Sequence, residues 1–177
     1  MTLGLLILRA IVGLLFVGHG AQKLFGSFGG HGLDGTGGFF ESLGLRPGRT
    51  HALAAGAAEL GGGALLALGL ITPLAALLVS AVMVTAIATV HGAKGPWATD
   101  GGYEYNLVLL AVAFALAAVG PGSASIDHAA GIHMAGAGWA IGELVLAVIG
   151  GLGAVAVGRS TRQRRPATRG PARPTAA

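Results

Sequence analysis

The sequence contains no cysteine and little charge. Only 10% of its 177 residues are charged, against about 25% in a typical soluble domain, and 53% are hydrophobic. Without cysteine the chain cannot itself supply a disulfide, a thiolate nucleophile, an iron–sulfur cluster or a covalently attached haem. Any redox role therefore requires a bound cofactor or the cysteines of a partner. Low charge combined with high hydrophobicity indicates a membrane protein.

Charge is scarce along most of the chain, and the formal net charge of +4 comes from one end of it. Six of the eleven Lys and Arg residues lie between Arg159 and Arg173. Such a tail is typical of a segment that flanks a membrane on its cytoplasmic side, so we expect no nucleic-acid partner. Because the tail is rich in Arg, Pro, Thr and Ala, we expect residues 159–177 to be disordered.

Long apolar runs fill the rest of the sequence. A helix needs about 20 mainly apolar residues to cross a lipid bilayer. Five segments reach or approach that length, and the fourth is the shortest: 3–25, 50–71, 73–91, 103–119 and 137–158. They predict one domain, residues 1–158, that folds as an all-α transmembrane helix bundle. Glycine is frequent inside these runs, as expected where small residues let membrane helices approach closely.

The first apolar run is expected to be a retained span and not a cleaved signal peptide. No basic stretch precedes the run, and Arg9 interrupts it. Lys23 and Phe25 stand where a cleavage site would follow.

The positions of the basic residues predict the orientation of the bundle. We call the surface where the chain begins side A and the opposite surface side B. With five spans, side B receives ten of the eleven basic residues, namely Lys23, Arg46, Arg49, Lys94 and the six arginines of the tail. The positive-inside rule then places side B in the cytoplasm. We therefore expect a multi-pass protein of the cell membrane with its N-terminus outside and its C-terminus cytoplasmic.

The loop between the first two spans is too long for a plain connection. Within it, residues 36–44 read as a short amphipathic helix that Thr36 caps and Gly44 ends. Phe39, Phe40 and Leu43 share one face of this helix. We expect it to lie in the membrane surface or to plug the mouth of the bundle.

Polar residues inside the spans gather at one end of the bundle. Ionisable residues within a membrane are costly, and by default they face the bundle interior or water. Antiparallel threading brings four span ends together on side B, and these ends carry His19, Lys23, Glu59, His91, Tyr103, Glu104 and Asn106. We predict that these seven residues form a pocket for a small ligand.

Two further charged residues suggest a buried ion pair. At a rise of 1.5 Å per residue, Arg9 lies about 9 Å below side A and Glu59 about 12–14 Å below side B. In a hydrocarbon core about 30 Å thick, long side chains could bridge the remaining gap. We predict an Arg9–Glu59 pair, with Arg9–Glu143 as the competing arrangement because Glu143 enters from side A at a similar depth.

Each of these functional interpretations has a structural alternative. Lys23 near a helix end can simply extend to the membrane surface. His19 and His91 can be core histidines that bond to Glu59 or to the backbone. As a pair they could also ligate a haem, and with Glu59 and Glu104 a metal, but no haem feature and no HExxH or ExxH motif accompanies them, so we expect neither. The remaining histidines read as ordinary loop or interface residues: His31, His51, His128 and His133.

Several linked motifs carry a family resemblance. They are HGAQKLFG at residues 19–26, FGGHGLDGT at 28–36 with Phe39-Phe40 and Leu43-Gly44 after it, AELGG at 58–62, and GGYEYNL at 101–107. In this order they resemble the DoxX family of integral membrane proteins, over about residues 3–127. The resemblance implies a core of four transmembrane helices, to which the last apolar run adds a fifth span.

The resemblance also carries an implication for function. The family takes its name from a subunit associated with thiosulfate:quinone oxidoreductase and the respiratory chain, and some members are associated with oxidative-stress or thiol-redox partners. This implies a redox-linked membrane subunit, more an accessory of an oxidoreductase system than an enzyme itself, with a quinone in its pocket and a soluble redox enzyme or respiratory protein as partner. Two other readings stay open: a scaffold without chemistry that recruits a soluble partner, and a small-solute or proton transporter, which would require a homo-oligomer.

Overall fold

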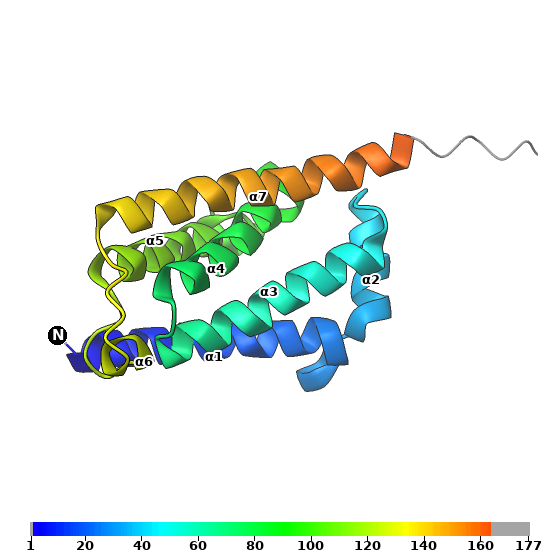
Figure 1. Cartoon of the computed structure of the whole chain (residues 1–177). Helices are drawn as coiled ribbons and strands as arrows, with labels where there is room; N and C mark the ends of the chain where they lie inside the picture. The colour runs from blue at the N-terminus through cyan, green and yellow to red at the C-terminus, as the bar shows by residue number, and fades with distance from the viewer. Residues whose placement is uncertain (1, 164–177) are drawn as a thin grey trace, which may run out of the picture.

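The computed structural model describes residues 2–163, and these residues form helices and connections without any strand (Figure 1). The longer helices are α1 (Thr2–Phe25), α2 (Gly32–Ser42), α3 (Gly48–Leu68), α4 (Thr72–Ala86), α5 (Glu104–Val119) and α7 (Ala137–Gln163). Short turns join them, namely η1 (Ser27–Gly29), η2 (Ile87–His91), η3 (Gly92–Lys94), η4 (Ala98–Asp100) and α6 (Ile126–Ala129). The predicted all-α bundle is confirmed.

Four helices of the described chain are long and apolar enough to cross a membrane: Leu3–Phe25, Gly48–Leu68, Thr72–Lys94 and Ala137–Thr161. Helix α5 is apolar but has only 16 residues. At 1.5 Å per residue it is about 24 Å long, which is less than the roughly 30 Å of a hydrocarbon core. The last helix continues past the predicted end of the fifth span to Gln163, and residues 164–177 of the predicted disordered tail lie outside the described residues.

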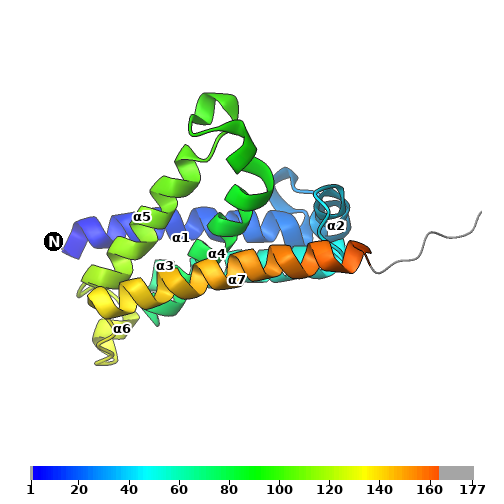
Figure 2. The ribbon, with the colours of Figure 1, turned by 90° about the horizontal axis from the view of Figure 1, so that it is seen from above.

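The helices form two groups. Helices α1 and α3 pack against each other along one side of the bundle, and α4, α5 and α7 form the other side (Figure 1). Helix α4 is central because it contacts α3, α5 and α7. Helix α2 lies at the end of the bundle where α1 ends and α3 begins, while α6 lies at the opposite end. The connection between α4 and α5 projects sideways from the bundle and does not extend as far along the bundle as α2 does (Figure 2).

Glycines bring α1 and α3 into backbone contact. A Cβ atom on Gly13 would lie 2.5 Å from the carbonyl oxygen of Gly63, and one on Gly20 would lie 2.5 Å from the backbone nitrogen of Leu60 and 2.7 Å from the Gly56 oxygen. No other residue type fits there without moving a helix. These two contacts fix the register of the helix pair, so the level of each polar side chain on α1 relative to α3 is also fixed.

A carboxylate near side A holds the start of α4. Asp127, in α6, accepts hydrogen bonds from the backbone nitrogens of Ile71 at 2.7 Å and Thr72 at 3.0 Å, and from the Thr72 hydroxyl at 2.8 Å. The side chain is 1% exposed. An acidic group at a helix N-terminus satisfies backbone N–H groups that have no partner within the helix. Asp127 therefore ties the α5–α7 connection to the α3–α4 turn.

Candidate functional site

A cavity of about 520 Å³ lies between the two groups of helices, toward the end that carries α2. Its walls are mostly apolar side chains of α1, α3, α4, α5 and α7. Helix α2 and the segment after it add Phe39, Phe40, Leu43 and Leu45. Helix α2 begins at Gly32, so Thr36 lies inside it and is not its cap as predicted, but the aromatic face predicted for residues 36–44 borders the cavity. A pocket with apolar walls and a few polar groups is the usual form of a small-molecule site.

Five of the seven predicted site residues line this cavity. They are His19, Lys23, Glu59, His91 and Asn106. Tyr103 and Glu104 are not among the lining residues. Glu104 is exposed, and its carboxylate accepts a hydrogen bond from the Ala98 backbone nitrogen at 2.9 Å.

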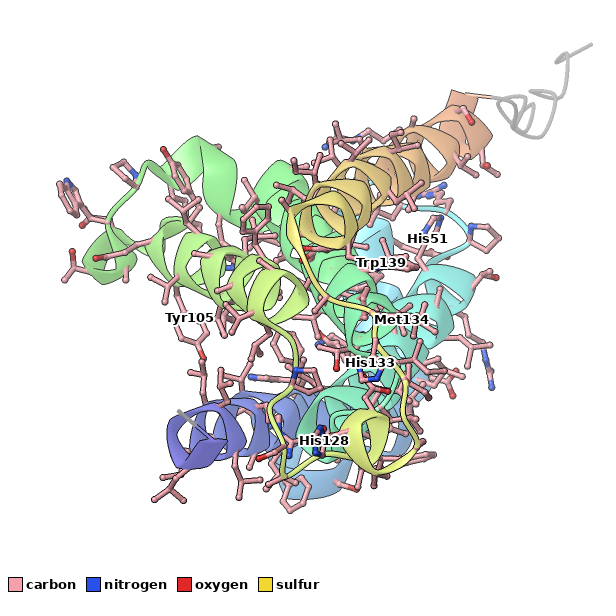
Figure 3. The ribbon with its side chains drawn as sticks, turned by 60° about the vertical axis from the view of Figure 1, so that its left-hand side comes forward. His51, Tyr105, His128, His133, Met134 and Trp139 are labelled. Carbon is pink, nitrogen blue, oxygen red and sulfur yellow. The ribbon has the colours of Figure 1, made fainter. Side chains whose placement is uncertain are left out.

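Sequence reasoning missed two residues of the cavity wall. Tyr105 on α5 and His51 on α3 both line the cavity, and Figure 3 labels both side chains. Tyr105, Asn106 and Leu109 lie on one face of α5, and the spacing between 105 and 109 was a usable signal. His51 lies against α7, where a Cβ atom on Gly158 would be 2.9 Å from its Nε2. No local sequence pattern predicts this contact between residues far apart in the chain. From the sequence alone, His51 is therefore interpreted as an ordinary loop or interface residue.

The strongest polar contact in the cavity is an ion pair. The Lys23 Nζ lies 2.6 Å from Oε2 of Glu59, and the two side chains are 23% and 4% exposed. The glycine contacts between α1 and α3 bring the two residues together. Buried charges in proteins are normally paired in this way, because an isolated charge in an apolar medium is costly.

The predicted pairing of Arg9 is wrong in both of its forms. Glu59 pairs with Lys23, while Arg9 is 2% exposed and donates from Nη1 to the Ala67 carbonyl oxygen at 3.2 Å. The helix register explains this, because it sets Arg9 two turns of α3, or roughly 12 Å, from Glu59. Neither carboxylate oxygen of Glu143 has a hydrogen-bond partner among the described residues. The Ser80 hydroxyl lies near Glu143 without making a bond of ordinary geometry.

Each of the two predicted histidines is held through its Nδ1 atom. His91 lies at the end of η2, a π-helical turn that continues α4, and its Nδ1 is 2.7 Å from the Gly101 carbonyl oxygen. The Nδ1 of His19 is 3.1 Å from Oε1 of Gln22, whose Nε2 donates to the Phe28 carbonyl oxygen at 3.2 Å. Turns of the π type inside α-helices often occur at functional sites.

Two of the other histidines lie away from the cavity, and the described residues contain no group of metal ligands. His128 and His133 lie on and after α6, at the opposite end from α2 (Figure 3). Within residues 2–163, no group of three or more His, Asp or Glu side chains is arranged to hold a metal ion.

Comparison with known proteins gives the family. The DoxX family model matches residues 4–92, a segment that contains His19, Lys23, Glu59 and His91. A protein of Bacillus subtilis (strain 168), named "Putative oxidoreductase CatD", is 35% identical over 114 residues, which are 64% of this chain and 78% of that protein. No solved structure matches the chain. With half of its length matched by the family model and a relative covered over most of its length, the chain belongs to the DoxX family of membrane proteins.

Proposed function

We propose that this protein is a redox-linked membrane subunit that binds a quinone, or a similar small ring compound, in the cavity beside α2. The observation that carries the proposal is the cavity itself. It brings an ion pair and two oriented histidines together with mostly apolar walls, within the helices that cross the membrane. Titratable groups in an apolar, water-poor setting are frequent at functional sites.

The lining fits such a ligand. Leu15, Phe16 and Leu109 provide apolar surface for an alkyl tail, and the rings of Phe39 and Phe40 meet at 6.0 Å between centroids near the α2 end. A membrane quinone reaches a protein site from within the bilayer, which suits a cavity between spanning helices. The absence of cysteine favours a bound redox compound over thiol chemistry, and the oxidoreductase name of the Bacillus subtilis relative agrees with a redox role.

The chain's own residues would then hold the ring and handle protons. When bound, a quinone would supply two-electron chemistry coupled to protons. Glu59 would accept a hydrogen bond or a proton through the carboxylate that Lys23 stabilises, and His91 through Nε2, the ring nitrogen not engaged by Gly101. Lys23 would also balance any negative charge that develops on the ring. The electrons would have to come from or go to a partner, because the chain has no redox-active side chain of the cysteine type.

The test is extraction of the detergent-purified protein with organic solvent, followed by chromatography with absorbance detection of quinone and haem. We expect near-stoichiometric quinone in the wild type and its loss in a folded Glu59→Gln variant. Glu104→Gln is the matched control, because this carboxylate lies outside the cavity wall. Absence of quinone from the wild type, prepared from membranes that contain it, would contradict the proposal and favour a scaffold without chemistry.

A further inference from the structure

The hydrogen bonds of the cavity wall show which groups still have bonding capacity. A carbonyl oxygen can only accept, so the contact between His91 and Gly101 requires the hydrogen of the ring to be on Nδ1. In the neutral ring Nε2 is then an acceptor. The same holds for His19, because the Gln22 amide donates to Phe28 and so presents its oxygen to the His19 Nδ1. No partner for either Nε2 occurs among the described residues.

Other polar groups of the wall have used some or all of their hydrogens. Asn106 donates one of its two Nδ2 hydrogens to the Met83 sulfur at 3.3 Å, which leaves one N–H donor and the Oδ1 acceptor. Thr85 donates its hydroxyl hydrogen to the Ala81 carbonyl oxygen at 2.9 Å, and Thr89 donates to the Thr85 carbonyl oxygen at 2.7 Å. A hydroxyl has one hydrogen, so both threonines face the cavity only as acceptors.

The remaining donors lie on other side chains. Lys23 directs one of its three ammonium hydrogens to the Glu59 carboxylate. The Tyr105 hydroxyl and the His51 ring can each donate or accept. Four side chains of the wall can therefore only accept from a ligand, because their hydrogens are already used: His19, Thr85, Thr89 and His91.

Side chains that can only accept discriminate between the two redox states of a quinone. The oxidised ring carries carbonyl oxygens, which only accept, whereas the reduced ring carries hydroxyl groups, which donate. Placing a carbonyl against a bare imidazole nitrogen leaves both groups unsatisfied, and an unsatisfied buried polar group costs binding free energy. We propose that the cavity binds the reduced quinol, an aromatic alcohol on an apolar tail, in preference to the oxidised quinone. This inference rests on the proposed function and adds the redox state of its ligand.

The experiment measures partition of defined probes into nanodiscs that contain the full chain, relative to empty nanodiscs, under anaerobic conditions. One probe pair is decylubiquinol and decylubiquinone. A second pair, 4-decylphenol and 4-decylanisole, has the same tail and ring and differs by the methylation of the donor hydroxyl. We expect the quinol and the phenol each to bind roughly tenfold more tightly, or better, than their partners.

One substitution tests whether His91 is responsible for the preference for the quinol. His91→Phe keeps a planar ring but removes the Nε2 acceptor, so the quinol preference should fall severalfold while binding of the quinone stays near its wild-type value. Glu104→Gln should leave the preference unchanged. Quinone binding equal to or tighter than quinol, or no difference between the phenol and the anisole on the wild-type protein, would overturn the inference while leaving the quinone site intact. If neither the quinol nor the quinone binds, the result contradicts both this inference and the proposed function.

Discussion

At the scale of single residues, two buried glutamates in the spanning helices have opposite surroundings. Glu59 has a lysine at 2.6 Å, whereas both oxygens of Glu143 have no hydrogen-bond partner among the described residues. Both side chains are about equally buried, at 3% and 4% exposed. Since burial is the same, a difference in their contribution to stability must come from the partner.

We therefore predict that substitution by glutamine has different effects at the two glutamates. Glu59→Gln leaves the Lys23 ammonium without its counter-charge and should lower the free energy of unfolding by about 3 kcal/mol. Glu143→Gln removes no bond and should change it by less than about 1 kcal/mol. Unfolding in mixed micelles, followed by circular dichroism, measures both values. Equal losses in the two variants would show that the Lys23 contact does not stabilise the fold.

Asp127 offers a second prediction at this scale. Its carboxylate accepts three hydrogen bonds at the start of α4. Asp127→Ala should destabilise the protein by about 2–3 kcal/mol, because the Ile71 and Thr72 nitrogens lose their partner. The exposed neighbour Ala130, substituted by Ser, serves as control. An unchanged melting temperature for Asp127→Ala would argue against the role of Asp127 as a helix cap.

At the scale of the helices, the α1–α3 contact depends on glycines that are not interchangeable. A Cβ atom on Gly20 would collide with the backbone of α3, whereas a Cβ atom on Gly18, two residues earlier on the same helix, meets nothing within 4 Å. The first substitution forces two backbones apart, and the second only adds a methyl group to an open surface.

Alanine at each position should separate the two cases. Gly20→Ala should cost about 1–3 kcal/mol and weaken the Lys23–Glu59 pair, because both residues depend on this register. Gly18→Ala should be neutral or slightly stabilising, since alanine favours a helix more than glycine does. Micelle unfolding again gives the comparison. A larger loss in Gly18→Ala than in Gly20→Ala would be incompatible with this helix contact.

The sequence predicts the helices better than it predicts their contacts. Apolar runs indicated α1, α3, α4, α5 and α7, and the positions of His19, Lys23, Glu59 and His91 on helix faces placed them in one cavity. The pairing of Arg9 could not be predicted from depth alone, because it depends on the α1–α3 register. That register is determined by which glycines meet, and each helix has several candidates.

At the scale of the whole molecule, the orientation in the membrane remains a prediction from charge. Because the chain has no cysteine, a single introduced cysteine reports on one position only. Asp100→Cys in the α4–α5 connection and Ala130→Cys after α6 are both exposed positions. In intact cells a membrane-impermeant maleimide should label the second and spare the first until the membrane is opened. The reverse pattern would place side B outside.

The π-helical turn at Ile87–His91 has a consequence for how α4 tolerates length changes. Such a turn contains more residues than an α-helical turn, so it shifts the angular position of every residue that follows. Deleting one residue within it would restore a regular helix and leave His91 at nearly its present angle around the axis, because the π-helical turn already accommodates one extra residue. Thr85, which precedes the turn, would keep its place. The turn can therefore absorb the loss of one residue without re-aiming the imidazole, whereas the loss of one residue from the regular part of α4 would rotate His91 by about 100°.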